Sequence, residues 1–297
     1  MALTNNKLAI ALGNFDGVHK GHARLMEEAL AFKKQGFIPA ALMFESDPEN
    51  CLAGSPVSLQ ITSNKEKEDI LRSMGIEKVI FIDFMSNKDL SPDEFVNMLV
   101  KEYNAGALIC GFHYRFGKHA AGDASKLKQL CEKYDLGYKM VDAFVMDGMV
   151  VSSTNIRSFI ASGDMERAAK SLGRYFSVES PVCEGKHLGK VLGFPTINQR
   201  IREDGAVPAH GVYITKVTAL NKVYCGVSNV GLRPTVENTE TCNIETNILD
   251  FDGDLYGKTV KVEFIKMLRS EKKFANTEEL RRAISVDREK ARKFFEK

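Results

Sequence analysis

Residues Gly13–His22 read GNFDGVHKGH and stand between an apolar run, Leu8–Leu12, and an amphipathic segment, Ala23–Gln35. This order predicts a buried strand, a glycine-bearing turn and a helix. The start of a helix after such a strand presents free backbone N–H groups and the positive end of the helix dipole, so it attracts phosphate. His19 and His22 are three residues apart, and both imidazoles are expected to face that phosphate. The stretch therefore predicts nucleotide chemistry.

The composition is that of a globular protein long enough for two domains: 297 residues, 44% hydrophobic and 27% charged. A net charge of +2 argues against a dedicated nucleic-acid binder. No apolar run approaches the roughly 18 residues that span a membrane, and the N-terminus lacks the pattern of a signal peptide. The six cysteines form no CxxC pair, which favours reduced thiols in a cytoplasmic protein over a zinc site or disulfides. The expected partners are small molecules rather than nucleic acid or a membrane, and a weak homo-oligomer is left open.

The first half of the chain alternates apolar runs with helical patterns, which predicts a parallel sheet with crossover helices. The expected strands are Leu8–Leu12, Ile38–Phe44, Val79–Ile82 and Ala107–Cys110, and further helices are expected at Asn64–Met74, Pro92–Tyr103 and Ser125–Tyr134. Ser91 is a predicted N-cap with Glu94 completing a capping box. Because ligands of such sheets bind at the carboxyl ends of the strands, the polar junctions Gly13–His22 and Gly111–Asp123 are expected to line one crevice.

After about Gly173 the pattern changes to short β-branched segments, which predicts an antiparallel barrel or sandwich. The expected strands are Gly211–Val217, Val223–Val230, Cys242–Leu249 and Thr259–Phe264, followed by a terminal helix over Thr277–Phe295 that Asn276 caps. The segment Gly173–Pro181 is predicted to join two domains, residues 1–172 and 182–297. The polar stretch Glu49–Ser63 is interpreted as an irregular loop.

Several motifs now become specific together. GNFDGVHKGH resembles the signature of the nucleotidylyltransferase superfamily, in the form found in prokaryotic bifunctional riboflavin kinase/FAD synthetases. Further segments resemble that family in the same order along nearly the whole chain: LSPDEFV (Leu90–Val96), GFHYRFG (Gly111–Gly117), SSTNIR (Ser152–Arg157), GFPTIN (Gly193–Asn198), GVSNVGLRPT (Gly226–Thr235), IETNILDFDGDLYG (Ile244–Gly257) and LRSEKKF (Leu268–Phe274). The resemblance implies an α/β fold: a Rossmann-like nucleotidylyltransferase sheet, then an antiparallel β-barrel riboflavin kinase domain with a terminal helix.

For residues 1–172 the resemblance implies an FMN adenylyltransferase that makes FAD and pyrophosphate from FMN and MgATP. His19 and His22 match the catalytic, phosphate-binding histidines. The remaining matched nucleotide-binding residues are Gly13, Asn14, Phe15, Asp16 and Gly17 in the loop, and Ser152, Ser153, Thr154 and Arg157 in the second motif. A guanidinium at Arg157 can grip phosphate bidentately. From its own residues alone, SSTNIR is better interpreted as a Ser/Thr cap before a helix over Asn155–Ala161, and the GNFDGVHKGH motif shifts the balance to a functional role.

For residues 182–297 the resemblance implies a kinase that phosphorylates the ribityl 5′-hydroxyl of riboflavin. Glu245 matches the family's general base, which a neutral alcohol needs. Thr196 and Asn198 match a Mg²⁺- and ATP-binding pair, and neutral oxygens suit a hard cation that also binds phosphate. Gly185, Gly189 and Gly193 are expected to let the loop approach the nucleotide, although no Walker A pattern is present. Without the resemblance, Glu245 would be interpreted as a solvated strand carboxylate and the glycines as a series of β-turns. Thr196 and Asn198 would then be turn residues after Pro195.

The chain departs from the family pattern mainly in the first domain. There Asp47 stands where the family has histidine, His113 replaces an Asp or Asn, and the loop Lys118–Gly122 lacks an arginine that is often present. In the second domain Lys190 stands where arginine is common, and Asn247 stands where histidine is common, two residues after Glu245. An acid at Asp47 would repel ATP phosphates, so Asp47 and His113 are uncertain site residues. These changes leave two alternatives to the two-site enzyme: an enzyme with one activity, with kinase-only favoured, and a flavin- or nucleotide-binding regulator without catalysis.

Overall fold

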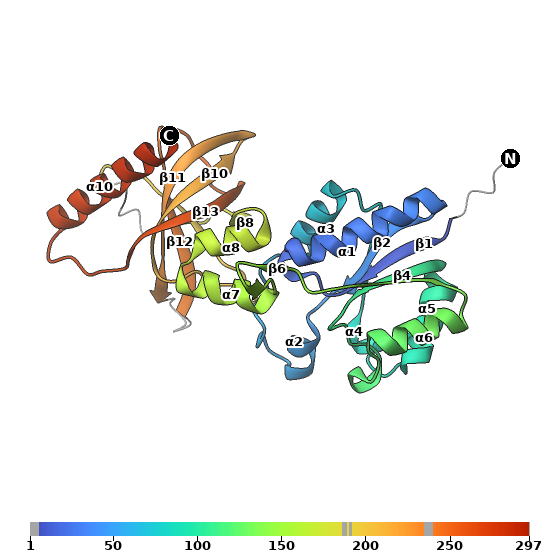
Figure 1. The fold of residues 1–297 in the computed structure, drawn as a ribbon. Helices are drawn as coiled ribbons and strands as arrows, with labels where there is room; N and C mark the ends of the chain where they lie inside the picture. The colour runs from blue at the N-terminus through green and yellow to red at the C-terminus, as the bar shows by residue number, and fades with distance from the viewer. Residues whose placement is uncertain (1–5, 186–188, 190–191, 235–239, 297) are drawn as a thin grey trace. The chain divides into compact units, whose positions relative to one another are not determined.

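The structure is a computed structural model that describes residues 6–185, 189, 192–234 and 240–296, without the side chains of 232–234 and 240–242. The chain forms two compact units, Met1–Ser153 and Thr154–Lys297, whose elements are labelled in Figure 1. Each unit is built around its own sheet.

The first unit contains a five-stranded parallel sheet whose central strand precedes the GNFDG turn. The strands, in spatial order, are β3 (Lys78–Ile82), β2 (Ile38–Phe44), β1 (Leu8–Leu12), β4 (Ala105–Gly111) and β5 (Gly137–Val141). The helices are α1 (Lys20–Ala31), α2 (Pro48–Ala53), α3 (Asn64–Ser73), α4 (Phe84–Asn87), α5 (Pro92–Tyr103) and α6 (Ala124–Lys133), with 3₁₀ turns η1 (Asp16–Val18), η2 (Phe32–Gln35) and η3 (Lys118–Ala120). A two-stranded hairpin, β6 (Val145–Met146) and β7 (Met149–Val150), follows β5.

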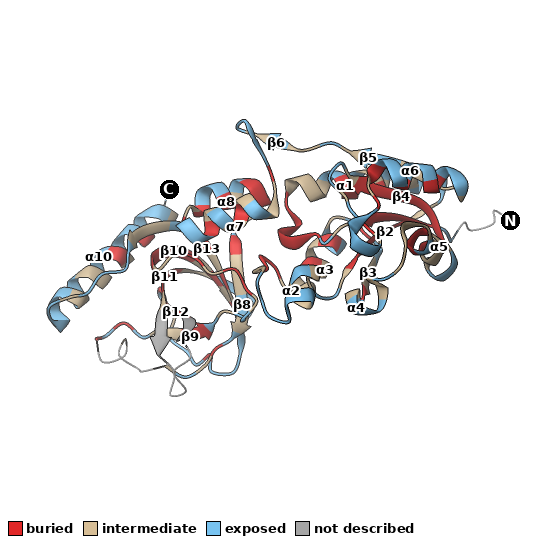
Figure 2. Ribbon diagram, turned by 90° about the horizontal axis from the view of Figure 1, so that it is seen from below, coloured by how far each residue is buried: buried red, intermediate tan, exposed pale blue. Residues whose placement is uncertain are grey.

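Strand β1 is buried on both faces, and its alternation assigns the helices to layers (Figure 2). Leu8, Ile10 and Leu12 belong to a core shared with α5 and α6. Ala9 and Ala11 belong to a second core shared with α1 and α3, where small side chains let the helices approach the sheet. The expected doubly wound sheet is confirmed.

Two local features of this unit differ from the sequence prediction. Helix α1 begins at Lys20 rather than Ala23, because His19 caps it by accepting the backbone N–H of His22. The polar stretch Glu49–Ser63 contains helix α2 and ends in the buried residues Gln60, Ile61 and Thr62, so it is not an irregular loop throughout. The predicted capping box of Ser91 and Glu94 is present.

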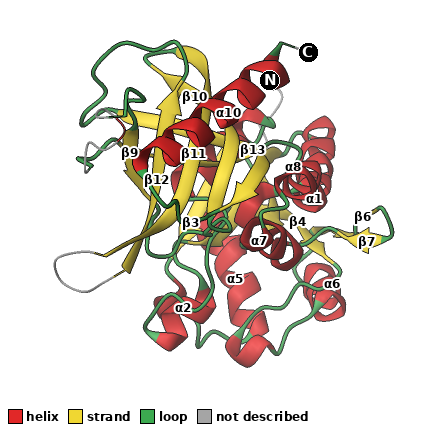
Figure 3. Cartoon of the chain, turned by 90° about the vertical axis from the view of Figure 1, so that its left-hand side faces the viewer, coloured by secondary structure: helices red, strands yellow, loops and turns green. Residues whose placement is uncertain are grey.

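The second unit contains a six-stranded antiparallel sheet that nearly closes into a barrel (Figure 3). In spatial order its strands are β8 (Phe176–Pro181), β13 (Thr259–Ser270), β10 (Gly211–Ala219), β11 (Lys222–Pro234), β12 (Glu240–Ile248) and β9 (Ile197–Arg200). The two edges meet where the Cys183 N–H donates to the Asn198 carbonyl at 2.8 Å. The Gln199 side chain also donates to the Ser180 carbonyl at 2.8 Å. Edge strands that meet in this way expose few unpaired backbone groups.

Three helices complete the second unit: α7 (Ser153–Ser162), α8 (Met165–Leu172) and the terminal α10 (Thr277–Phe295). Helix α10 packs against β10 and β11, and the Asn276 side chain caps it as expected. Residues Phe176–Pro181 form strand β8, paired with β13, rather than a simple join. Helix α8 packs against strands β8 and β13 of the barrel. The functional boundaries 1–172 and 182–297 stay a prediction.

Candidate active sites

The loop after β1 holds an uncommon backbone conformation. Phe15, Gly17 and Val18 all have positive φ angles, of 50°, 75° and 37°. Such angles are strained for a β-branched residue and persist only where packing enforces them. Here Phe15 and Val18 are fully buried in the core that α1 and α3 share with the sheet. The core therefore sets the shape of the predicted phosphate loop.

Asp16 anchors this loop from inside. Its buried carboxylate accepts the backbone N–H groups of Ile61 at 2.8 Å and Thr62 at 3.2 Å. The Thr62 hydroxyl in turn accepts the Gly17 N–H at 3.0 Å. Sequence reasoning missed Ile61 and Thr62, since they lie 45 residues away from the loop and carry no motif. Asp16 thus ties the loop to residues 61 and 62. Its contact with the nucleotide stays a prediction.

His19 and His22 lie together at the start of α1, with their rings stacked at a centroid distance of 3.6 Å. His19 Nδ1 accepts the His22 backbone N–H at 3.2 Å. In the neutral ring the proton must then sit on Nε2, which becomes the donor. Gly21 permits this arrangement, because a Cβ there would stand 3.0 Å from the His19 ring. The pair can present imidazole donors beside the helix N-terminus.

The second motif reaches the same loop. The Ser153 hydroxyl donates to the Asp16 carbonyl at 2.9 Å. Ser152 is half-buried, whereas Asn14 is exposed and Gly13 is partly covered by the Phe15 ring. Thr154 and Arg157 follow on α7 in the second unit, so their role at the loop stays a prediction.

Asp47 and His113, the two uncertain site residues of the first domain, lie in different surroundings. Asp47 caps α2: its carboxylate accepts the N–H groups of Glu49 at 3.0 Å and Asn50 at 3.4 Å. A capping carboxylate is stabilised by these N–H groups and by the helix dipole. His113 is exposed after β4, with its ring 3.5 Å from that of Phe112. Strands β1 and β4 are neighbours, so the two predicted junctions begin side by side at one edge of the sheet.

A cavity of about 360 Å³ lies in the first unit, lined mainly by aromatic and apolar side chains. Phe44 ends β2, Phe84 follows β3, and Tyr114 and Phe116 follow β4, so the cavity lies at the carboxyl end of the sheet. Its charged lining residues are Lys88, Asp89 and Arg115, and Lys88 pairs with Asp89 at 2.9 Å. Such a cavity can hold a flat aromatic ring.

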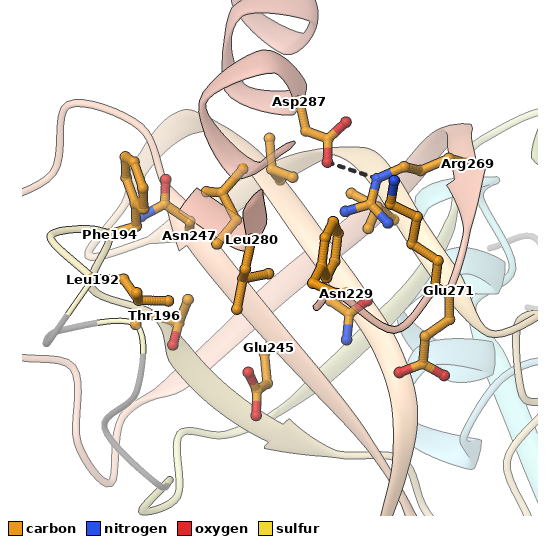
Figure 4. Close-up of a pocket in the computed structure, with 16 residues that line it drawn as sticks. Leu192, Phe194, Thr196, Asn229, Glu245, Asn247, Arg269, Glu271, Leu280 and Asp287 are labelled. Atoms are coloured by element: carbon orange, nitrogen blue, oxygen red, sulfur yellow. Dashed lines mark hydrogen bonds and ion pairs between the residues drawn. The ribbon is translucent and has the colours of Figure 1, made fainter. Parts of the chain in front are cut away.

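In the second unit, a cavity of about 300 Å³ contains Glu245 (Figure 4). One part of its wall is apolar: Leu192, Phe194, Val212, Val227, Phe274, Leu280 and Ile284. Arg269 and Asp287 stand at the α10 side and form a buried ion pair of 2.9 Å. This ion pair fixes α10 to β13 beside the cavity. An apolar slot with a few convergent polar groups is typical of a ligand site.

A neighbouring cavity of about 420 Å³ shares Thr196 with the first one. Its wall includes Asn198, Ile248, Phe251 and Tyr256. Asn198 of β9 is the direct register partner of Glu245 on β12, so both side chains project from one face of the sheet. The structure therefore brings Glu245, Thr196 and Asn198 together at the junction of two cavities.

Gly185, Gly189 and Gly193, the three predicted glycines, are among the described residues, and Lys190 lies outside them. A Cβ on Gly185 would stand 2.2 Å from the Asn198 amide, and one on Gly189 would stand 3.0 Å from the Thr196 hydroxyl. Only glycine permits this close approach. Gly193 has a φ of 80° and open space around its α-carbon, so it serves the turn rather than a contact.

The donor set fits Mg²⁺ that is shared with phosphate oxygens. Asn198 is 5% exposed and its Oδ1 accepts a hydrogen bond from Asn243 at 3.0 Å, which fixes the amide and leaves a second lone pair. Within the described residues, no group of three or more His, Cys, Asp or Glu side chains could hold a metal. A hard cation here would thus depend on neutral oxygens and on its nucleotide.

Comparisons with known proteins find a separate family model for each half of the chain. A family model described as FAD synthetase matches residues 2–155, and one described as riboflavin kinase matches residues 172–295. Two bifunctional riboflavin kinase/FMN adenylyltransferases are each 32% identical to the chain. The protein from Bacillus subtilis (strain 168) aligns over 97% of this chain and 93% of its own length. The protein from Escherichia coli (strain K12) aligns over 96% and 92%.

A crystal structure from Streptococcus pneumoniae is similar over both units, with a TM-score of 0.87 and 30% identity. It covers 97% of this chain and 94% of its own, and it is described as a macrolide-efflux protein. Among the described residues of the present chain, no helix has the length and apolarity to cross a membrane. Both family models match, and relatives of known function align over nearly the whole chain. The chain therefore belongs to the bifunctional riboflavin kinase/FMN adenylyltransferase family and carries both of its domains.

Proposed function

We propose that the chain phosphorylates riboflavin to FMN in the barrel and adenylylates FMN to FAD in the first domain, with ATP as the second substrate of each reaction. Residues 1–172 form the adenylyltransferase domain in this proposal, and residues 182–297 the kinase domain. The observation that carries it is the junction at Thr196, where an apolar cavity containing Glu245 meets a second cavity. Because ATP is the phosphoryl donor, the enzyme is expected in the cytoplasm.

In the kinase reaction, the apolar cavity would hold the flavin ring and the second cavity the nucleotide. Glu245 would accept the proton of the ribityl 5′-hydroxyl as that oxygen attacks the γ-phosphorus and the bond to ADP breaks. Thr196 and Asn198 would hold Mg²⁺ together with the ATP phosphates. When bound, the ion would neutralise charge on the transferred group. Gly185 and Gly189 would let backbone N–H groups approach the nucleotide.

In the adenylyl transfer, a phosphate oxygen of FMN would attack the α-phosphorus of ATP and release pyrophosphate. The Nε2–H of His19 and the His22 ring would stabilise charge on the α-phosphate. Gly13, Asn14, Gly17, Ser152, Thr154 and Arg157 would complete the nucleotide site. The cavity lined by Phe44 and Tyr114 would hold the flavin ring, which accounts for its aromatic and apolar lining.

The test supplies the purified chain with MgATP and either riboflavin or FMN, and separates the products by chromatography. FMN followed by FAD from riboflavin, and FAD from FMN, are expected. FMN as the final product, even when FMN is supplied, would leave a kinase only. FAD from FMN without any phosphorylation of riboflavin would remove the kinase. Flavin that binds but is never turned over would favour the regulator.

A further inference from the structure

Two asparagines flank Glu245 on the same face of β12. Asn243 and Asn247 each stand two residues from Glu245, and side chains at that spacing point to one side of a strand. Both asparagines are buried, with 5% and 6% of their surface exposed. Buried amides in a strand require partners, and the partners of these two lie in one place.

Each asparagine holds one side of the segment that carries Thr196 and Asn198. The Nδ2 of Asn243 donates to Asn198 Oδ1 at 3.0 Å. The Nδ2 of Asn247 donates to the carbonyl of Pro195, the residue before Thr196, at 2.7 Å. A carbonyl only accepts, so this bond fixes the orientation of the Asn247 amide. Strand β12, which carries the proposed base, is thus hydrogen-bonded to both ends of the segment Pro195–Asn198.

The amide of Asn247 is only half satisfied: its nitrogen donates to Pro195, but its buried oxygen accepts no hydrogen bond among the described residues. An unsatisfied buried oxygen is unfavourable for stability, and an apolar side chain of similar volume would avoid it. Residues that lower stability in this way are typical of functional sites.

We propose that Asn243 and Asn247 are positioning residues, which set the distance between Glu245 and the Pro195–Asn198 segment for phosphoryl transfer. The proposal rests on the kinase function proposed above. A misplacement of about 1 Å between reacting groups can lower a rate by up to a hundredfold. Loosening either amide should therefore slow the transfer without emptying the flavin cavity.

The test compares Asn247→Leu and Asn243→Leu with the wild type in steady-state kinase assays. For Asn247→Leu, kcat should fall at least tenfold, and the thermal midpoint should stay near that of the wild type. Asn247 lines the riboflavin cavity, so Asn243→Leu separates kcat from KM: Asn243 lines neither cavity, and its variant should lose kcat while its KM for riboflavin changes less than twofold. Asn243→Leu should in addition raise the Mg²⁺ concentration for half-maximal rate, because Asn198 loses its fixed orientation. Asn247→His should recover most of kcat, since its Nδ1–H can occupy the place of Nδ2–H.

Ser228→Ala is the matched control. Its buried hydroxyl joins Thr215 at 2.8 Å and Thr246 at 2.7 Å inside the barrel and lies outside both cavities. This variant should lower the thermal midpoint and keep kcat. A wild type that does not phosphorylate riboflavin would remove the proposed function itself. The positioning role would be overturned if the wild type is active and the asparagine variants keep kcat, or lose it only in proportion to the folded protein. If the leucine variants do not fold, the same comparison is made with Asn247→Ser.

Discussion

The Ser153 hydroxyl donates a hydrogen bond of 2.9 Å to the carbonyl oxygen of Asp16, across 137 residues of sequence. Asp16 belongs to the loop after β1, and Ser153 opens helix α7. The bond therefore joins the two motifs that the proposed adenylyltransferase site uses. Because Asp16 also bonds to residues 61 and 62, two segments that are distant in the sequence fix one loop.

Ser153→Ala removes this link. The rate of FAD synthesis from FMN should fall roughly tenfold, since a loosened loop misplaces the phosphate-binding groups. Riboflavin phosphorylation should not change. The control is Ser162→Ala on the same helix, whose hydroxyl only bonds the Phe159 carbonyl within the helix. Equal losses in the two variants would argue that Ser153 merely supports the helix.

Substitutions at His19 separate its structural role from its chemical one. Asparagine is a good N-cap and can accept the His22 N–H, whereas alanine cannot, so His19→Asn should be about 1 kcal/mol more stable than His19→Ala. Both variants lose the Nε2–H donor and should make FAD about 100-fold more slowly. Urea unfolding and initial rates measure the two effects. A fully active His19→Asn enzyme would mean that His19 is only a cap.

Glu245→Gln tests the proposed base. The amide cannot accept the hydroxyl proton, so riboflavin phosphorylation should slow by about 10²- to 10⁴-fold. Conversion of supplied FMN to FAD should continue at the wild-type rate. Glu263→Gln is the control: this strand glutamate lies outside the cavities and pairs with Lys216 at 2.8 Å. A Glu245→Gln enzyme with normal kinase activity would refute the assignment.

Local signals in the sequence predicted the strongly patterned elements, but not shorter ones such as β5, β8 and β9. Ser91 and Glu94 form the predicted capping box because every atom involved lies within one turn. The start of α1 was placed three residues late, because histidine is an unusual cap. The role of Asp16 depends on backbone N–H groups 45 residues away, which no local pattern encodes.

At the kinase site, too, local signals were informative and long-range partners were not predictable. The resemblance to a family marked Glu245, Thr196 and Asn198. The β-branched pattern predicted the strand that carries Glu245, but not β9, which carries Asn198. Neither could show that β9 pairs with β12 so that Asn198 lies opposite Glu245. Strand pairing is set by the packing of the whole barrel. The asparagines beside Glu245 became meaningful only once that register was known.

Asp287→Ala should loosen the terminal helix. The Asp287 carboxylate is 3% exposed and pairs with Arg269 at 2.9 Å, so its removal leaves a largely buried, uncompensated guanidinium. A loss of about 3 kcal/mol in the free energy of unfolding is expected, together with a higher KM for riboflavin because both residues line the flavin cavity. Glu278→Ala provides the contrast. Its ion pair with Arg282 on the same helix is exposed, and its loss should change stability by less than about 0.5 kcal/mol.

The thiols of the first core should make stability decline in alkali. Burial raises the pKa of Cys131 from 9.0 to about 12, and it raises the pKa of Cys110 as well. An unfolded chain releases these protons near pH 9, whereas the folded chain holds them. Their contribution to stability is therefore complete below pH 9 and is lost as the pH rises from 9 toward 12.

Urea unfolding midpoints between pH 8 and pH 11 measure this effect. The decline should be shallower in Cys131→Ala than in the wild type, whatever the stability that the smaller side chain costs at pH 8. Alkylation of the native protein by iodoacetamide at pH 8 gives a second readout. Cys131 should not react, because the thiolate is the nucleophile and this thiol is 1% exposed, whereas the half-buried Cys51 should react. Parallel pH profiles in the two proteins would mean that other groups cause the alkaline loss.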